Sequence, residues 1–196
     1  TVIGAFYNRV DYLKLVLAGF ERQPLKNFEF IIADDGSGED VVSEIKIISS
    51  RYTFPIKHIW QGDKGFRKNK ILNKAILEAG SDYLIFIDCD CVPHKAFVDG
   101  HINNAEQDIL LTGRRVNLSE KITNHLTEDN VRKGFLESNY LKLFIDGLFG
   151  NSIDVEKGFY FKSKFLLNYL NRKNRGILGC NFSLFKEDLF KVNGFD

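Results

Sequence analysis

Short apolar runs alternate with amphipathic stretches along the first half of the chain. The apolar runs are rich in Val, Ile and Phe, a composition typical of strands buried on both faces of a sheet. The stretches between them carry apolar residues every three or four positions, which predicts helices. The predicted strands are residues 1–7, 28–33, 55–60 and 82–87, and the predicted helices are residues 11–22, 39–50 and 69–79.

The regular order of strand and helix predicts an α/β fold with a mostly parallel sheet. Parallel strands need crossover connections, and right-handed crossovers place helices on both faces of the sheet. The second half of the chain is less regular. Strands are expected there at residues 108–116 and 177–185, and helices at residues 127–144 and 186–192. Since no linker or repeat interrupts the pattern, we expect one domain over residues 1–196.

The strand expected at 82–87 leads directly into two carboxylates, Asp88 and Asp90. Side chains alternate along a strand, so these two carboxylates point to the same side and Cys89 points to the other. They also follow the C-terminal end of the strand, where open α/β sheets bind their ligands. Two hard oxygen ligands suit Mg²⁺ or Mn²⁺ carrying a diphosphate. An isolated Asp-x-Asp is equally consistent with two solvated loop acids.

Three further polar loops follow the other predicted strands, at residues 7–9, 34–37 and 62–67. Because the strands are parallel, all four loops lie at one edge of the sheet, which favours a metal and ligand site over solvated acids. The glycine-rich G-x-G-x-x-G loop is absent after the first strand, where Tyr7-Asn8-Arg9 stands instead. A dehydrogenase or a P-loop enzyme is therefore not indicated.

Composition narrows the picture further. The net charge of +1 gives no case for nucleic-acid binding. Three cysteines without disulfide spacing favour a reducing compartment, and no apolar run reaches the ~18–20 residues of a membrane span. We expect a cytoplasmic protein, with peripheral membrane contact through an aromatic and basic stretch at 142–175 as an option. The chain has no Met and ends abruptly, so we expect a piece of a longer protein.

The order of these loops resembles that of family 2 glycosyltransferases, which have the nucleotide-sugar-binding GT-A fold. The matching motifs are residues 6–9 (Phe-Tyr-Asn-Arg), 34–37 (Asp-Asp-Gly-Ser) and 88–90 (Asp-Cys-Asp). Residues 60–67, with Asn73, resemble a loop of members that build capsular and chondroitin-like polysaccharides. Residues 179–183 and 193–196 resemble a galactosyltransferase-type C-terminal segment. The likeness covers nearly the whole chain and implies a nucleotide-binding half at 1–92 and an acceptor-side half at 93–196.

The resemblance implies a role for each motif residue in holding a nucleotide-sugar. Asp35 or Asp34 would accept the ring N–H of uracil, although an Asx-turn closed by Gly36 is an equally natural use of either carboxylate. Tyr7 would offer its ring face to the base, or else lie in the core. The other donor-binding residues that the resemblance implies are Ala5, Phe6, Arg9, Lys64, Arg67, Cys89, Gly179 and Asn181.

The same resemblance implies where the metal and the catalytic base lie. Asp88 would contact the ribose and the metal, and Asp90 would bind Mn²⁺ or Mg²⁺ between the two phosphates. Arg67, with Lys64 and Lys68, would approach the diphosphate, unless this loop is simply a solvated basic one. The base of such relatives usually lies in a Glu-Asp pair shortly after the position of Asp196. Asp196 is itself a weaker candidate for the base.

These expectations favour a metal-dependent, inverting glycosyltransferase. It would move a hexose, of the galactose, GalNAc or GlcNAc type, from a UDP-sugar to a glycan or lipid-linked acceptor in surface polysaccharide synthesis. One alternative is a module that binds nucleotide-sugar without turnover. Another is a haloacid-dehalogenase-like phosphatase with Asp88 as nucleophile. The phosphatase is disfavoured because its Asp-x-Asp normally lies on the first strand, whereas three strand–helix units precede it here.

Overall fold

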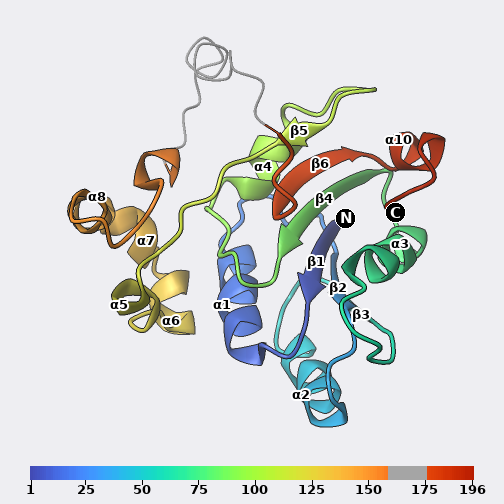
Figure 1. Ribbon diagram of the computed structural model, residues 1–196, viewed down its shortest axis with the longest axis horizontal. Helices are drawn as coiled ribbons and strands as arrows, with labels where there is room; N and C mark the ends of the chain where they lie inside the picture. The colour runs from blue at the N-terminus through green and yellow to red at the C-terminus, as the bar shows by residue number, and fades with distance from the viewer. Residues whose placement is uncertain (159–175) are drawn as a thin grey trace.

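The computed structural model describes residues 1–158 and 176–196 of the chain. A central sheet carries helices on both faces, and a group of short helices lies beside one of them (Figure 1). The six strands run in the order β3-β2-β1-β4-β6-β5. They are β1 (Val2–Phe6), β2 (Phe30–Asp34), β3 (Ile56–Trp60), β4 (Tyr83–Asp88), β5 (Leu111–Thr112) and β6 (Asn181–Phe185).

The strands β1 to β4 are parallel to one another, as the alternating pattern predicts. Their register aligns Ala5 with Ala33 on one side and with Asp88 on the other. The strand ends that precede the polar loops therefore meet at one edge. Crossovers through α1 (Val10–Glu21), α2 (Glu39–Ser49) and α3 (Lys68–Glu78) join the four strands. The predicted elements of this half agree with the observed ones to within a few residues.

Two apolar clusters lie on the two faces of the sheet. On one face, α1, α2 and α4 (Phe97–Ile102) pack through residues such as Leu17, Phe20 and Ile45. On the other, α3 and α10 (Lys186–Lys191) pack through Ile71, Ile76 and Leu189. All of these side chains are almost wholly buried. Fully burying an aliphatic or aromatic side chain contributes about 1.5–3 kcal/mol, so the two clusters hold the helices firmly on the sheet.

The second half differs from its predicted elements in three places. The strand predicted at 108–116 is reduced to β5, and the strand predicted at 177–185 begins only at Asn181. The helix predicted at 127–144 is three short helices, α6 (Glu128–Arg132), α7 (Phe135–Ser138) and α8 (Tyr140–Leu148). Gly134 separates the first two with a φ of 78°, a left-handed conformation that interrupts a helix and that glycine adopts without strain.

Strand β6 enters the sheet antiparallel to β4, which makes the sheet mixed. Strand β5 pairs in turn with β6. The remaining helical segments, α5 (Glu120–Thr123) and η1 (Val155–Gly158), lie near α6 to α8 (Figure 1). Ion pairs join this group to α1 and the residue after it, from Arg132 to Glu21 and from Glu137 to Arg22. Much of the aromatic and basic stretch at 142–175 lies outside the described residues.

No helix in residues 1–158 or 176–196 combines the length and the apolar character that crossing a membrane requires.

Candidate nucleotide-sugar site

A pocket of about 630 Å³ opens where β1, β2 and β4 end and α3 begins. Eight of the predicted donor-binding residues line it, which the convergence of loops at one sheet edge anticipates. They are Ala5, Phe6, Tyr7, Arg9, Asp35, Asp88, Cys89 and Asp90. The other lining residues are Tyr12, Ala33, Asp63, Gly65, Phe66, Lys68 and Ile71. We call this cavity the strand-end pocket.

Asp34 is fully buried beneath the pocket and supports its wall. Its Oδ1 accepts hydrogen bonds from the backbone N–H of Ser37 at 2.9 Å and of Gly36 at 3.2 Å, and from the Ser37 hydroxyl at 2.6 Å. Its Oδ2 lies 2.9 Å from Nε2 of His58 on β3. The Asx-turn interpretation of this residue is therefore the observed one. With both oxygens occupied, Asp34 shapes the loop and does not line the pocket.

Asp35 lines the pocket and also fixes the loop that leads into α3. Its Oδ1 accepts from Nε2 of the buried Gln61 at 2.6 Å, and its Oδ2 accepts from the backbone N–H of Arg67 at 2.6 Å. A carboxylate oxygen has two lone pairs, so each can accept one more hydrogen bond from a ligand. Asp35 is thus held in one orientation while retaining the capacity to accept a ring N–H.

The turn after β1 is tied to the loop after β2. The backbone N–H of Asn8 donates to Ser37 Oγ at 2.8 Å, and Asn8 itself has a φ of 58°. The Tyr7 hydroxyl donates to Asp63 Oδ2 at 3.2 Å. Gly36 lies against the backbone of Asp63 with a φ of 107°, and a Cβ there would lie 2.7 Å from the Asp63 Cα. Only glycine fits that position, so the loop after β2 and the loop after β3 approach as closely as their backbones allow.

The end of β4 presents the two carboxylates with few protein partners. Asp88 is half-buried, and its Oδ1 accepts from the ammonium of Lys68, the first residue of α3. Asp90 is exposed, and among the described residues its Oδ1 accepts only one hydrogen bond, at 3.3 Å from the Cys91 thiol, which is a weak donor. Cys89 lines the pocket, but its thiol is buried in the core beside Gly4, and that burial raises the pKa of the thiol.

The two carboxylates fit a divalent cation that is shared with a bound diphosphate. In residues 1–158 and 176–196, no cluster of three or more His, Cys, Asp or Glu side chains is arranged to hold a metal by itself. Mg²⁺ is usually held by one or two carboxylates together with substrate phosphates, which suits a pair of this kind. The ammonium of Lys68 beside Asp88 shows that this end of the pocket already accommodates one positive charge.

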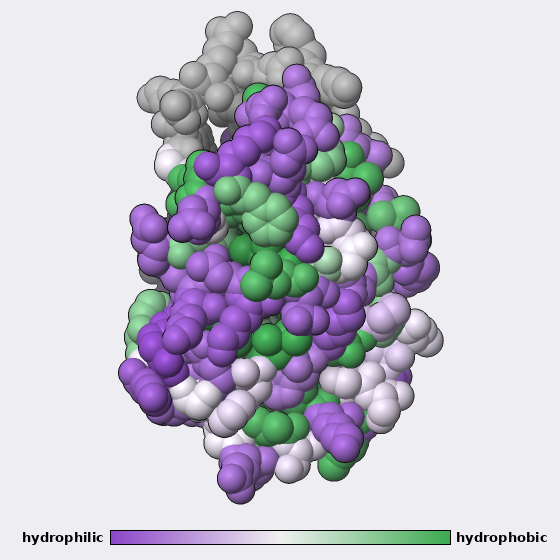
Figure 2. Space-filling model, turned by 90° about the vertical axis from the view of Figure 1, so that its right-hand side faces the viewer, coloured by the Kyte–Doolittle hydropathy of each residue, from purple (hydrophilic) through white to green (hydrophobic). Residues whose placement is uncertain are grey.

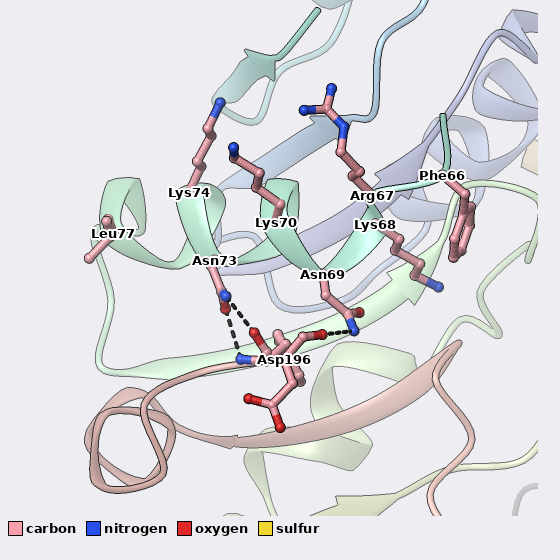
Figure 3. Close-up of a pocket in the computed structure, with 10 residues that line it drawn as sticks. Phe66, Arg67, Lys68, Asn69, Lys70, Asn73, Lys74, Leu77 and Asp196 are labelled. Atoms are coloured by element: carbon pink, nitrogen blue, oxygen red, sulfur yellow. Dashed lines mark hydrogen bonds between the residues drawn. The ribbon is translucent and has the colours of Figure 1, made fainter. Parts of the chain in front are cut away.

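Five of the residues that the resemblance implied, and the candidate base, lie outside the strand-end pocket. Asp34 is buried and does not line it, and Lys64 and Gly179 are exposed and do not line it either. The Arg67 guanidinium donates to the Gly62 carbonyl. Arg67 and Asp196 both line a neighbouring pocket (Figure 3).

Asn181, the fifth, is engaged in a buried polar network between α4 and β6. Its Oδ1 lies 2.9 Å from Nε2 of His101, whose Nδ1 lies 2.6 Å from Ser183 Oγ. The Tyr83 hydroxyl lies 2.7 Å from the same Ser183 oxygen. Burial of the imidazole lowers the pKa of His101 to about 4. The ring is therefore neutral at pH 7, and the network secures β6 to β4.

Several features of the pocket lining were not foreseen. Lys68 was expected near the diphosphate, but its contact with Asp88 was not foreseen. Asp63 and Phe66 belong to a loop that the sequence marks only as basic and glycine-containing. Tyr12 is half-buried, with the Arg9 guanidinium 3.9 Å from its ring centre. The first turn of α3 was a signal available in the sequence, since the start of a helix after a parallel strand faces the same edge as the loops.

Comparisons with known proteins place these motifs in one family. The model of "Glycosyl transferase family 2" matches residues 1–191. The chain is similar to the chondroitin synthase of Escherichia coli, with 24% identity over 97% of this chain and 28% of the relative. It is also similar to the hyaluronan synthase of Pasteurella multocida, with 29% identity over 57% of this chain and 11% of the relative. The match thus spans little more than a quarter of the length of the first relative and about a tenth of the second.

Two solved structures share the fold. One is a mannosyltransferase from Pyrobaculum calidifontis in complex with GDP-Man and Mn²⁺. The match covers 100% of this chain and 46% of the mannosyltransferase chain, with a TM-score of 0.61 and 15% identity. The other is glucosyl-3-phosphoglycerate synthase from Mycobacterium tuberculosis in complex with Mn²⁺, UDP and phosphoglyceric acid. The match covers 96% of this chain and 56% of the synthase chain, with a TM-score of 0.51 and 16% identity. The predicted GT-A type of α/β fold is confirmed. The chain belongs to glycosyl transferase family 2.

Proposed function

We propose that this chain is the donor-binding and catalytic domain of a metal-dependent, inverting glycosyltransferase. It transfers a hexose from a UDP-sugar to a glycan or lipid-linked acceptor in polysaccharide synthesis. Residues 1–92 form the nucleotide-binding half and residues 93–196 the acceptor-side half. The observation that carries the proposal is the strand-end pocket itself, where a rigid Asp35 and the Tyr7 ring lie at one end and the two open carboxylates at the other.

The residues of the pocket divide the work of holding the donor. Tyr7 offers a ring face to the base, and Asp35 accepts the uracil N–H. Asp88 and Asp90 hold Mn²⁺ or Mg²⁺, which when bound acts as a Lewis acid on the leaving nucleoside diphosphate. Lys68 can turn from Asp88 towards the phosphate oxygens, where an ammonium is a favourable partner. The fold relatives bound to UDP or GDP-Man together with Mn²⁺ support this arrangement.

Transfer requires one displacement at the anomeric carbon. A bond forms from the acceptor hydroxyl oxygen to this carbon as the bond to the diphosphate oxygen breaks, and the hydroxyl proton passes to a base. The carboxylates that line the pocket, within residues 1–158 and 176–196, are Asp35, Asp63, Asp88 and Asp90. We assign donor binding to three of these, and Asp63 is held by Tyr7 and Gly65. Asp196, beside the neighbouring pocket, remains a weak candidate for the base.

The test is thermal denaturation with added nucleotides, followed by a hydrolysis assay with a panel of UDP-sugars. UDP with Mn²⁺ should raise the Tm, because a ligand at one hundred times its Kd stabilises the folded state by about 2.7 kcal/mol. CDP with Mn²⁺ should raise it less, since the ring N3 of cytosine carries no hydrogen for Asp35 to accept. Wild-type protein that shows no rise with UDP and Mn²⁺ contradicts the proposal.

Nucleotide-sugar binding without turnover is the second candidate, favoured by the position of Asp196 outside the strand-end pocket. A chain extended past Asp196 should be assayed beside residues 1–196 with the same UDP-sugars. Transfer by the longer chain alone would show that the base lies beyond residue 196. Binding without transfer by both would favour the binding module. We place the protein in the cytoplasm, a location supported by the free thiols of Cys89, Cys91 and Cys180.

A further inference from the structure

Two cysteines that are far apart in the chain meet beside the carboxylates of the β4 loop. Cys91 follows Asp90, and Cys180 lies immediately before β6. Since β6 pairs antiparallel with β4, extending their register by one residue places Cys180 opposite Asp88 (Figure 1). The backbone N–H of Cys91 donates to the Asp88 carbonyl at 3.0 Å, and this turn brings Cys91 back towards Cys180. The two thiols are hydrogen-bonded to each other.

The surroundings of Cys180 favour its reactive form. The Nη1 of Arg115 donates to the Cys180 sulfur at 3.6 Å. The hydrogen bond with Cys91 and the Arg115 guanidinium hold the pKa of Cys180 below its ordinary value. The thiolate is the form of cysteine that peroxides oxidise, and a neighbouring cation stabilises it. Cys91 lies where a second thiol is needed to resolve an oxidised Cys180.

The third cysteine lies outside this thiol pair. A Cβ on Gly4 would lie 2.6 Å from the sulfur of Cys89, so this sulfur is packed in the core on the other side of the strand. A bond between two copies of the chain is also disfavoured. Cys180 is only 4% exposed, so the sulfur of a second chain cannot reach it. On the face shown in Figure 2, hydrophobic residues are scattered among hydrophilic ones, so that face has no broad apolar surface for pairing two chains.

We propose that Cys91 and Cys180 form a reversible disulfide when the protein meets hydrogen peroxide. The Cys180 sulfur attacks one peroxide oxygen, an S–O bond forms as the O–O bond breaks, and the released hydroxide takes up a proton to give water. The Cys91 sulfur then attacks the Cys180 sulfur. The S–S bond forms as the S–O bond breaks, and hydroxide leaves with the Cys91 proton as a second water. Two thiols are thus oxidised by two electrons, and one peroxide is reduced to two waters.

Hydrogen peroxide suits this site because it is little larger than water. Cys91 is half-buried, so the thiol pair borders solvent on one side. Small thiols such as glutathione would reduce the disulfide again by thiol–disulfide exchange. Disulfides in cytosolic proteins of mesophiles are usually transient, with catalytic or redox-sensing roles. The proposed cytoplasmic location therefore agrees with a switch that is open in the reduced protein.

The disulfide would act on the donor site through Asp90. In the reduced protein the Cys91 thiol donates to Asp90 Oδ1 at 3.3 Å, and a disulfide has no S–H to donate. Bonded sulfurs lie about 2.05 Å apart, closer than a hydrogen-bonded pair, so Cys91 must move towards β6 and displace the adjoining Asp90. Losing such a partner typically weakens metal binding about 10–100-fold. This consequence rests on the proposed function, whereas formation of the disulfide does not.

The first measurement detects the disulfide by mass spectrometry of pre-reduced protein treated with hydrogen peroxide. The chain has three cysteines and no methionine, so the cysteines hold its only sulfur atoms. Wild type should lose two hydrogen atoms and yield linked peptides of Cys91 and Cys180, which a reductant separates. Cys180→Ser should yield none. Arg115→Gln should form the link more slowly, and the control Arg51→Gln, at an exposed arginine after α2, should match wild type.

The second measurement compares the Kd for UDP with Mn²⁺ before and after oxidation, by calorimetry with the peroxide removed. Oxidation should raise the Kd of wild type at least about tenfold, and a reductant should restore it. Cys180→Ser should bind like reduced wild type throughout. Absence of a link between Cys91 and Cys180 in oxidised wild type overturns the inference, as does an unchanged Kd in linked protein. If reduced wild type does not bind UDP with Mn²⁺, the proposed donor chemistry fails, and the mass measurement still decides the disulfide.

Discussion

The loops after β2 and β4 each carry two aspartates, yet the protein treats the two pairs in opposite ways. After β2, Asp34 accepts three hydrogen bonds and contacts His58, and both oxygens of Asp35 are engaged. After β4, Asp88 is held only by Lys68 and Asp90 only by a weak thiol contact, within the described part of the chain. Both aspartates of the β2 loop are held by their own protein, and only Asp35 lines the pocket with acceptor capacity left, whereas the β4 loop leaves both carboxylates open to a ligand.

This difference shows that carboxylates in the same kind of loop can serve either structure or binding. A carboxylate whose oxygens are fully hydrogen-bonded within the protein fixes the shape of a backbone and contributes to stability. A carboxylate with few hydrogen-bond partners at a pocket contributes little to the stability of the folded state and remains available to a cation. Substitutions of Asp34 and of Asp90 should therefore separate stability from donor binding.

The largest effect on stability is expected from Asp34→Ala. Removing this carboxylate leaves the buried Ser37 N–H and hydroxyl, and the His58 ring, without their partner. Each buried donor left unsatisfied costs about 1–3 kcal/mol, so the free energy of unfolding should fall by about 3–5 kcal/mol. Urea denaturation measures this change. A loss below about 1 kcal/mol would show that the β2 loop is not held by Asp34.

Asp90→Ala should produce the opposite result. The side chain is exposed, so the unfolding free energy should stay within about 0.5 kcal/mol of wild type. The Tm rise with UDP and Mn²⁺ should disappear, a loss of about 2.7 kcal/mol of ligand stabilisation at one hundred times Kd. Asp108→Ala is the control, since Asp108 is an exposed aspartate far from the pocket that pairs with Lys191. A full Tm rise in Asp90→Ala would remove Asp90 from the site.

The buried network of His101 extends the comparison to a closed site that responds to pH. Burial lowers the pKa of His101 from 6.5 to about 4, so between these values the unfolded chain binds the proton more readily. Stability is therefore complete above pH 6.5 and is lost as the pH falls towards 4. At pH 5 the loss should be about 1–2 kcal/mol. Urea denaturation of wild type and His101→Gln at pH 7.5 and pH 5 should show a weaker pH dependence in the variant.

The smallest effect is expected from Lys68→Met. The Lys68 ammonium competes with a metal ion for Asp88, and the pair is about one-quarter exposed on each side. Partly exposed ion pairs contribute at most about 1 kcal/mol, so Mn²⁺ alone should bind the variant about two- to fivefold more tightly. Electron paramagnetic resonance of free Mn²⁺ measures this. Weaker binding of Mn²⁺ alone to the variant would show that Lys68 does not compete at this site.

The sequence predicted the first half of the fold well because the structure of that half is local. Each buried strand is a short apolar run, and each helix carries its apolar residues on one face. The local pattern of apolar residues therefore predicts both the type of each element and the face that it buries. The convergence of residues 7–9, 34–37 and 88–90 then follows from parallel strand direction alone. For this reason most residues expected in these loops do line the strand-end pocket.

The second half could not be predicted in the same way. Asn181 and Gly179 were expected at the donor, but β6 is antiparallel, and the network with His101 turns the Asn181 side chain away from the strand-end pocket. The partners of such a network are far apart in the chain, so local patterns carry no signal of them. Arg67 was likewise expected at the diphosphate, and its position beside Gly62 depends on the backbone contact of Asp35.

The pairing of β6 with β4 also bears on how the chain folds during synthesis. Tyr83 pairs with Phe185, so about one hundred residues must emerge from the ribosome before the strand beside β4 is available. Until then the backbone groups along one side of β4 are unpaired, and an open edge of this kind promotes association between chains. We expect a nascent chain that ends before Asn181 to aggregate, and one that extends through Phe185 to remain monomeric in a light-scattering assay.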